Sequence, residues 1–388
     1  MNVVMFSNYS IGSDLTSGSP TIFEGFTKQL ALNSNVKLSI ISMGKETAIH
    51  HMEHFVIYQI KKNRLLYIPF LTPIFYFKIK KIVKKLKPDI IHVGCTGYWN
   101  FFVAVMLQKK YPLVTTVLGI LTKEFGYRQK EFKKNWIIEK YKVIFERYSL
   151  SRLSYLIVPT SHIIPIIKSI SNTKAKFYTV ADGIDYNKIQ NILPRDEFKG
   201  DILFLSTLDK LKGPDVLIKA ISLIIDDLPD IKVIIGGAGP REEKLKSLVR
   251  ELGLENNIIF KGLIKGLDKK FGAIKSCKIL VAPSRWDCQP YAVIEGAACG
   301  KATIASDMSN PEFLDDRKTG LVFKSGNHLD FADKLKQLLL NDELREKMGN
   351  EGLIKSQDYD WSIIVNQSIK IYNTVIDIYN ININKGEK

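Results

Sequence analysis

The chain has 388 residues, of which 45% are hydrophobic and 25% are charged, and its net charge is +16. This composition excludes an intrinsically disordered chain and supplies enough apolar residues for two or more domains. Its four cysteines lack paired spacing, which argues against a disulfide framework or a zinc site. The first residues lack the features of a signal peptide and the apolar runs are too short to span a bilayer, so we expect a cytoplasmic protein.

The first half of the chain alternates short apolar strands with longer helical patterns, as parallel sheets covered by helices require. The predicted strands are rich in β-branched residues: NVVMF, VKLSIIS, DIIHVG, LVTTVLG, YLIVPTS and AKFYTV. Residues 74–87 have helical spacing, with apolar side chains on one side and lysines on another. Residues 127–148 have the same basic and aromatic character.

The excess positive charge lies entirely in this first half. Residues 1–180 hold 26 Lys and Arg against 9 Asp and Glu, whereas the rest of the chain holds 30 against 31. Basic amphipathic helices with aromatic residues suit an anionic bilayer, so we expect a peripheral contact with the inner face of the membrane. The alternatives are ordinary domain helices with a solvated lysine face, and charge that serves solubility alone. Nucleic acid is not expected as a partner, because no recognition motif accompanies the charge.

The strand and helix pattern restarts after a polar, turn-rich break at residues 181–201. The second series of predicted strands reads DILFLST, IKVIIGG, NIIFKG, KILVAPS, KATIAS and GLVFKS. Two successive series of this kind predict an α/β protein with two domains.

Two turns of the second half contain residues suited to phosphate. Lys212 ends a loop beside Gly213, just before a helix that Pro214 can begin, and a cation near a helix N-terminus suits a phosphate. A solvated loop lysine is the alternative. Gly237 and Gly239, in VIIGGAGP, let the backbone approach a ligand or pack tightly, although the third glycine of a dinucleotide fingerprint is missing.

Two carboxylates surround the start of another predicted helix. Asp287 follows the strand KILVAPS, at the edge where ligands bind in open α/β folds, and Pro290 can begin a helix that carries Glu295 about one turn in. The amides of that helix suit an anion, and carboxylates accept hydrogen bonds from sugar hydroxyl groups. The alternative is that Asp287 caps the helix and Glu295 is a surface acid, although the neighbours of Glu295 in the helix are apolar.

Asp287, Glu295 and the following GAACGKATIAS resemble the E-x7-E motif of the GT-B glycosyltransferases, particularly family 4, the glycosyl transferases group 1. Other family motifs are similar to four further segments: STLDKLKGPDVLIKA, IIGGAGPREEKLKSLVRELGLENNIIFKG, YTVADGIDYNKI and YDWSIIVNQSIKIY. The resemblance covers the second half almost continuously and in the family's order. It implies an α/β GT-B fold, with two Rossmann-like domains whose parallel sheets face each other across a cleft.

The domain bounds and roles follow from the same resemblance. Residues 1–182, joined by a C-terminal helix over residues 362–388, would bind the acceptor, and residues 183–361 would bind the donor. The implied activity is a retaining transfer of a hexose from a UDP- or GDP-linked nucleotide sugar to a glycan or lipid-linked acceptor. No metal or other cofactor is expected, because no D-x-D motif stands in the usual place.

The resemblance also assigns roles to individual residues. Glu295 would bind the ribose hydroxyls, Asp287 the hydroxyls of the donor sugar, and Lys212 the diphosphate. Further donor contacts are expected from Thr207, Gly237, Gly239, Gln289, Pro290 and Tyr291. On the acceptor side we expect contacts from Gly12, Gly18, His92 and Gly119, with a packed strand-end histidine as the alternative for His92.

Three departures from the family pattern leave a second hypothesis open. Asp287 is one methylene shorter than the usual glutamate, Thr207 replaces the arginine of the family's GRL, and Leu118 replaces a common histidine. A non-catalytic nucleotide-sugar-binding subunit of a glycosyltransferase complex is therefore the alternative. An epimerase on the same fold is less favoured, because the first half lacks an additional acid and base pair.

Overall fold

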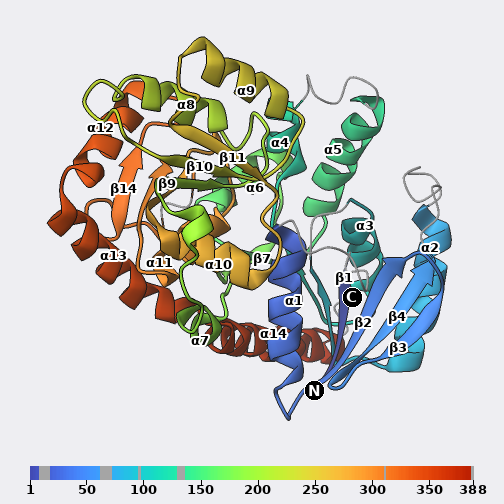
Figure 1. Cartoon of the computed structure of the whole chain (residues 1–388). Coiled ribbons are helices and arrows are strands. Elements are labelled where there is room, and N and C mark those ends of the chain that lie inside the picture. Colours follow the sequence, from blue (N-terminus) through green and yellow to red (C-terminus); the bar gives the residue numbers. More distant parts are fainter. Residues whose placement is uncertain (8–17, 62–71, 95–97, 129–135, 310–311, 386–388) are drawn as a thin grey trace. The chain divides into compact units, whose positions relative to one another are not determined.

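The structure is a computed structural model of the chain, which describes residues 1–7, 18–61, 72–94, 98–128, 136–309 and 312–385 (Figure 1). The chain folds as two compact α/β units. Unit 1 comprises Met1–Gly183 and Trp361–Lys388, and unit 2 comprises Ile184–Asp360. None of the helices in these described ranges is long and apolar enough to cross a membrane.

Unit 1 contains an eight-stranded sheet in the order β3-β4-β2-β1-β5-β6-β7-β8. Its strands are β1 (Asn2–Ser7), β2 (Lys37–Gly44), β3 (Ala48–His51), β4 (Phe55–Lys61), β5 (Ile90–Val93), β6 (Leu113–Thr116), β7 (Tyr155–Val158) and β8 (Lys176–Thr179). All neighbours pair in parallel except β3 and β4, which are antiparallel. The six strands expected from the sequence are confirmed, whereas β3 and β4 were not predicted.

The helices of unit 1 include one that returns from the far end of the sequence. They are α1 (Gly18–Ala31), α2 (Thr72–Leu86), α3 (Tyr98–Leu107), α4 (Leu121–Arg128), α5 (Trp136–Leu150), α6 (Ile163–Ser171) and α14 (Trp361–Asn384). Trp361, Ile364 and Tyr372 of α14 are buried in the core that covers β1 and β2. The C-terminal helix is therefore a structural part of unit 1.

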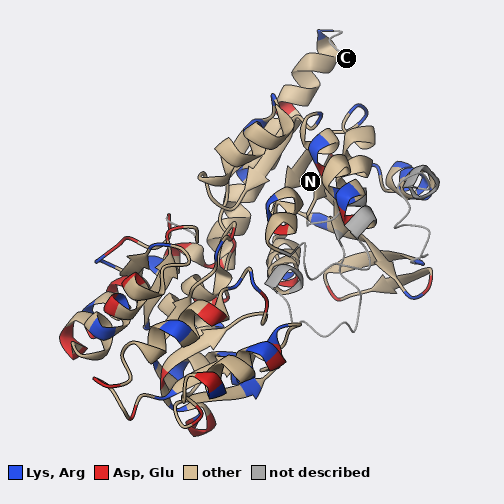
Figure 2. Cartoon of the chain, turned by 90° about the horizontal axis from the view of Figure 1, so that it is seen from above, with Lys and Arg blue, Asp and Glu red and all other residues tan. Residues whose placement is uncertain are grey.

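Helix α2 has the amphipathic character that its sequence predicts. Tyr76, Ile79 and Val83 are buried, whereas Lys78 and Lys81 are exposed. Figure 2 shows that Lys and Arg lie mostly on helices and turns. The lysine face of α2 is therefore open to solvent or to a partner.

Unit 2 contains a fully parallel six-stranded sheet in the order β11-β10-β9-β12-β13-β14. Its strands are β9 (Gly200–Leu205), β10 (Val233–Gly236), β11 (Ile258–Gly262), β12 (Cys277–Ala282), β13 (Ala302–Ser306) and β14 (Gly320–Phe323). The helices are α7 (Tyr186–Gln190), α8 (Pro214–Ser222), α9 (Glu242–Glu251), α10 (Leu267–Ser276), α11 (Tyr291–Ala298), α12 (His328–Leu339) and α13 (Asp342–Ser356), with 3-10 turns at Asp196–Phe198 and Gln357–Tyr359.

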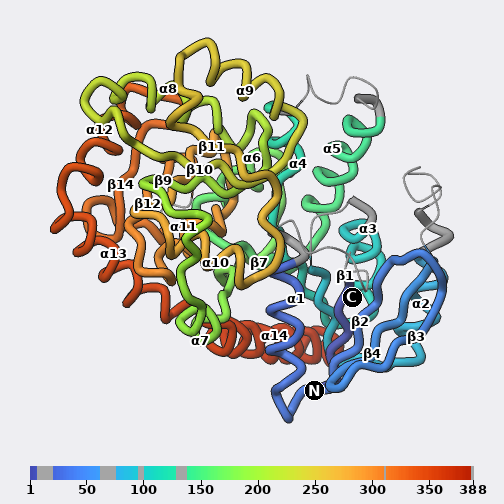
Figure 3. Tube along the Cα trace, in the orientation of Figure 1, coloured from blue at the N-terminus to red at the C-terminus, as the bar shows by residue number. Residues whose placement is uncertain are grey.

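Both faces of the second sheet are covered by apolar layers. Ile202 and Phe204 of β9 belong to one buried cluster, and Leu203 between them belongs to the other. Side chains alternate between the faces of a strand, so a continuous apolar run is what a sheet buried on both sides requires. Strand order reverses between the neighbours β9 and β12 (Figure 3). Open α/β sheets bind ligands beyond the carboxyl ends of their strands at such a point.

Candidate functional site

The loops that follow β9 and β12 are held together at this reversal point. The Arg285 amide donates to the carbonyl of Leu211 at 2.7 Å. Gly213 has a φ of +69°, and a Cβ there would lie 2.1 Å from the carbonyl oxygen of Pro283. Only glycine meets both conditions, because other residues would be strained and would clash. The glycine beside Lys212 therefore lets the two loops touch.

This contact brings two of the predicted site residues together. The ammonium group of Lys212 lies 2.5 Å from Oδ2 of Asp287. Their side chains are 22% and 15% exposed, so the ion pair is only partly shielded from solvent. The Lys212 amide donates to Oδ1 of the buried Asp209 at 2.9 Å, which fixes the loop. Pro290 occupies the N-cap of α11 without a side-chain cap, so the alternative that Asp287 caps the helix is wrong.

Glu295 forms a second lysine–carboxylate pair on α11. The residue is 2% exposed, so the alternative of a surface acid is wrong. Lys270 of α10 donates from Nζ to Oε1 of Glu295 and lies 5.4 Å from the ring centre of Tyr291. Burial raises the pKa of Glu295, and the charge and hydrogen bond of Lys270 oppose that rise. Lys270 thus favours the ionised form of a carboxylate that burial disfavours.

Sequence motifs did not identify Lys270. It lies 25 residues before Glu295, in a helix whose pattern contains no feature of the family motif. A physical signal did exist, since a buried carboxylate needs a partner and LDKKFGAIK provides basic residues in the preceding helix.

The glycine turn after β10 serves packing. A Cβ on Gly237 would lie 1.9 Å from the carbonyl oxygen of Ser206, and one on Gly239 would lie 2.5 Å from that of Leu208. The Gly237 amide donates to the carbonyl of Gly262 at 2.7 Å. The glycines therefore let the β10 turn lie against the β9 loop, and the Gly237 amide is used within the fold rather than turned to a diphosphate.

Thr207 is exposed on the β9 loop, where the family pattern has an arginine. The nearby Arg285 is engaged elsewhere, with bonds of 2.9 and 2.7 Å to Asp215 and one of 2.7 Å to the carbonyl of Lys210. Burial works to raise the pKa of Asp215, but the hydrogen bonds and charges of Arg285 and Arg241 outweigh it and hold the pKa below its usual value. This arginine cluster stabilises the loop at the start of α8.

The other predicted donor contacts lie between the two acids. Gln289 and Pro290 are buried, and Tyr291 is the half-buried first residue of α11. The Val293 amide donates to the carbonyl of Pro290 at 2.9 Å and so closes the first turn. Asp287, this helix start and Glu295 therefore follow one another along the loop and helix after β12.

The predicted acceptor residues belong to unit 1. His92 is 4% exposed, and its ring nitrogens lie 2.6 Å from the hydroxyls of Tyr372 and Thr116. Burial lowers the pKa of His92 to about 3. Both nitrogens are used inside the unit, as in the packed strand-end alternative. His92 and Leu118 line a small cavity of about 50 Å³.

Two of the glycines predicted on the acceptor side lie in different parts of unit 1. Gly119 is buried just after β6, and Gly18 is the first residue of α1. Gly12 lies outside the described residues. Within the described ranges, no group of three or more His, Cys, Asp or Glu is placed to hold a metal ion.

Comparison with known proteins gives two family matches in succession along the chain. Residues 27–188 match Glycosyltransferase Family 4, and residues 185–354 match Glycosyl transferases group 1. The chain belongs to the family 4 glycosyltransferases. This membership confirms the resemblance seen in the motifs around Asp287 and Glu295.

The curated relatives of this family 4 member match it over part of their length. The phosphatidyl-myo-inositol mannosyltransferase of Mycobacterium leprae (strain TN) is 32% identical over 177 residues, which are 45% of this chain and 46% of that protein. The D-inositol 3-phosphate glycosyltransferase of Arthrobacter sp. (strain FB24) is 28% identical over 186 residues, or 47% and 44% of the two chains. The matched stretch thus spans about half the length of these relatives.

Solved structures share the fold over nearly the whole chain. The sucrose-phosphate synthase of Thermosynechococcus elongatus has a TM-score of 0.80 at 16% identity, covering 97% of this chain and 99% of that one. The Anabaena protein HepE, solved with UDP and glucose, has a TM-score of 0.71 at 14% identity, covering 96% and 100%. These likenesses show the GT-B fold, with two parallel-sheet domains.

Proposed function

We propose that this protein is a retaining glycosyltransferase, which moves a hexose from a UDP- or GDP-linked donor to a glycan or lipid-linked acceptor. The observation that carries the proposal is the pair of lysine–carboxylate contacts, Lys212 with Asp287 and Lys270 with Glu295, at the carboxyl edge of the second sheet. Family membership, the UDP and glucose bound by HepE and the names of the inositol-modifying relatives support it.

Each pair has a role in donor binding. The diphosphate attracts the Lys212 ammonium away from Asp287, and the released carboxylate accepts hydrogen bonds from the donor sugar. Glu295, kept ionised by Lys270, accepts hydrogen bonds from the ribose hydroxyls. At Asp287 a contact within the protein is replaced by one to the ligand, whereas Glu295 keeps its contact with Lys270 and gains the ligand, so neither acid is left without a partner.

The transfer step needs little further chemistry from the protein. The acceptor oxygen forms a bond to the anomeric carbon on the face from which the diphosphate leaves, and the bond from that carbon to the phosphate oxygen breaks. The departing phosphate takes the proton of the acceptor hydroxyl. Lys212 and the amides at the start of α11 stabilise the developing negative charge, which is the main contribution expected of the site.

We propose that no metal ion takes part, since Lys212 and the α11 N-terminus already supply positive charge to the diphosphate. Transfer should continue unchanged in EDTA. Loss of activity in EDTA that magnesium or manganese restores would overturn this part of the proposal.

A screen of UDP- and GDP-sugars tests the function. The right donor should raise the melting temperature, undergo slow hydrolysis and support transfer to a crude acceptor extract. The second candidate, a non-catalytic nucleotide-sugar-binding subunit, is favoured by the exposed Thr207 and by Leu118. It predicts a thermal shift without hydrolysis or transfer for every common donor.

The basic residues of unit 1 motivate a further part of the proposal. Two groups of exposed cations in unit 1 could contact a membrane: the lysines of α2, such as Lys81, and the lysines and arginines at the amino ends of β5 to β8, such as Arg152. A peripheral contact with the anionic inner face of the membrane would bring the protein to a lipid-linked acceptor. Co-sedimentation with acidic and neutral vesicles, at low and high salt, tests this contact.

A further inference from the structure

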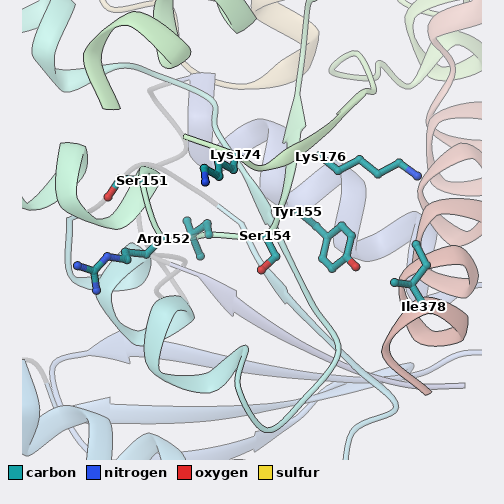
Figure 4. A pocket seen from close by; sticks show the side chains of 8 residues that line it. Ser151, Arg152, Ser154, Tyr155, Lys174, Lys176 and Ile378 are labelled. Carbon is teal, nitrogen blue, oxygen red and sulfur yellow. The ribbon is translucent and has the colours of Figure 1, made fainter. Parts of the chain in front are cut away.

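A hollow of about 440 Å³ lies in unit 1 at the amino ends of β7 and β8. It is lined by the turn Ser151–Tyr155, by Lys174 and Lys176 at the start of β8, and by Ile378 of α14 (Figure 4). Ligands of open α/β sheets bind at the carboxyl ends of the strands, so this hollow is at the opposite edge of the sheet. It therefore has no place in the donor and acceptor chemistry described above.

The wall of the hollow is fixed by hydrogen bonds. Gln108 donates from Nε2 to the carbonyl of Arg152 at 2.8 Å and accepts from the Ser154 amide at 3.0 Å. The Lys176 amide donates to the carbonyl of Ser154 at 2.8 Å. These bonds tie the end of α3, the turn before β7 and the start of β8 into one rigid frame.

Three cationic side chains lie around this frame, and none of them forms an ion pair with a described acidic residue. Arg152, Lys174 and Lys176 are exposed, and none has an acidic group within 4.0 Å among the residues that the structure describes. Arg152 lies 4.7 Å from the ring centre of Tyr148, and Lys176 lies 5.3 Å from that of Tyr178. Figure 4 shows the side chains of Arg152 and Lys176 extending in opposite directions, so that their charged ends point away from each other. The positive charge therefore lies at the rim of the hollow, on both of its flanks.

The hollow is one end of a basic strip along this edge of the sheet. The segments at the amino ends of β5 to β8 are residues 84–89, 109–112, 151–154 and 172–176, which together hold eight Lys and Arg, all exposed, and one acid, Asp89. The four strands are consecutive neighbours, so the strip extends over roughly 15 Å at the usual strand spacing. A strip this long creates a positive electrostatic potential over an area larger than a single small anion covers, which favours an extended anionic partner.

We propose that this strip lies against an anionic membrane surface and that the cations at the rim of the hollow bind the phosphates of phospholipid headgroups. The tyrosines beside the cations favour a bilayer over a soluble polyanion, because amphipathic rings are suited to the boundary between headgroups and acyl chains. Tyr148 is 44% exposed beside Arg152, and Tyr155 lines the hollow itself. This proposal identifies the surface that makes the peripheral membrane contact proposed above. It does not require that the protein transfers a sugar.

Vesicle binding by two matched variants tests this placement. The first carries Arg152→Gln, Lys174→Gln and Lys176→Gln, and the second carries Lys78→Gln, Lys80→Gln and Lys81→Gln on α2. Both lose the same net charge, and thermal unfolding checks that both remain folded. The full chain should sediment with vesicles of phosphatidylcholine and phosphatidylglycerol but not with phosphatidylcholine alone.

The hollow variant should lose binding on the order of a hundred-fold, since each base near such a surface contributes about a fivefold factor. The α2 variant should stay within a few-fold of the unchanged chain. Equal losses in both variants, a larger loss in the α2 variant, or no binding to acidic vesicles would overturn the proposal.

A phosphate titration separates the lipid from a soluble source of the same chemistry. Inorganic phosphate should protect the unchanged chain from thermal unfolding only weakly, and less in the hollow variant. Strong protection by inorganic phosphate without vesicle binding would assign the hollow to a soluble phosphorylated ligand. Binding to dextran sulfate without vesicle binding would assign the strip to a soluble polyanion, and either result would overturn the membrane proposal.

Discussion

The carboxyl edges of the two sheets carry different kinds of polar groups. In unit 2 the polar groups at this edge are two lysine–carboxylate pairs, and the lysine side chains remain 22% and 23% exposed. In unit 1 the corresponding cluster is the neutral trio of His92, Thr116 and Tyr372, in which the histidine is 4% exposed. The edge in unit 2 therefore has charged groups that a ligand can reach. In the trio of unit 1, the polar side chains hydrogen-bond to one another and are buried.

This difference separates groups that serve a ligand from groups that serve the fold. The Lys212–Asp287 pair is partly exposed and contributes little to stability, so a ligand can break it at small cost. A buried neutral cluster offers a ligand no free donor or acceptor, and it costs free energy to open. We therefore expect changes in the charged pairs to affect donor chemistry and changes in the neutral trio to affect stability.

The largest effect should come from Glu295→Ala. Loss of a buried acceptor costs roughly 1–3 kcal/mol per hydrogen bond. With two ribose hydroxyls, transfer should fall by about thirty-fold or more. Steady-state kinetics with the donor found in the screen measures this loss, and circular dichroism checks the fold. Normal turnover of the variant would show that Glu295 is structural and would remove the distinction between the two edges.

The neutral trio of His92, Thr116 and Tyr372 should make the free energy of unfolding depend on pH in the acid range. The folded-state pKa of His92 is about 3, below its unfolded value, so the unfolded chain takes up a proton first as the pH falls below about 6.5. Stability that depends on His92 is therefore present at neutral pH and is lost in acid. Between pH 7 and pH 5 the loss amounts to about 2 kcal/mol.

Urea unfolding of the unchanged chain and of His92→Gln at both pH values measures this contribution. The variant should lose about 2 kcal/mol less than the unchanged chain over this pH interval. Each protein is compared with itself, so the cost of the substitution at pH 7 cancels. Nucleotide binding should be the same in both. Identical pH dependence, or weaker nucleotide binding in the variant, would contradict a purely structural trio.

Lys270→Met tests whether the second pair keeps Glu295 ionised. Burial alone raises the pKa of Glu295, and without the opposing cation it should rise further. Nucleotide affinity should fall about tenfold near neutral pH and recover as the pH rises, because a carboxyl with a raised pKa ionises only at higher pH. Lys270→Arg should retain affinity across the range. A loss independent of pH in both variants would instead indicate a packing role.

Much of this architecture is visible in the sequence, and the omissions have physical causes. Twelve apolar runs were identified as strands, and most of them are buried on both faces, which leaves uninterrupted apolar patterns. The edge strands β8 and β11 are the exceptions, with exposed and half-buried residues. Strand β3 was missed because it is a four-residue edge strand with alternately half-buried and exposed side chains, including Ile49 at 54% exposure. Strand β4 follows it in a hairpin that the parallel pattern does not anticipate.

The site shows the same limit at the level of single side chains. Asp287, Glu295 and Lys212 could be found because their spacing along the chain is part of a motif. Lys270 could not, because its contact with Glu295 depends on how α10 lies beside α11. Gly237 was identified as a special position, but only the structure shows that the space a Cβ would fill is taken by the backbone at Ser206.

The smallest expected effect is a change in nucleoside diphosphate affinity, and its direction tests how the Lys212–Asp287 pair works. Asp287 holds the ammonium group of Lys212, so a diphosphate must compete with this carboxylate for it. Asp287→Asn keeps the shape of the side chain but removes the competing charge. A partly exposed pair is worth about 1 kcal/mol, so the nucleoside diphosphate should bind about fivefold more tightly to the variant, even though transfer of the sugar falls. Lys212→Met, the matched change in the other partner, should weaken binding and transfer together. Calorimetric titration of both variants measures these opposite shifts. Weaker nucleoside diphosphate binding in Asp287→Asn would mean that the ion pair organises the loop for the ligand, rather than being exchanged when the ligand arrives.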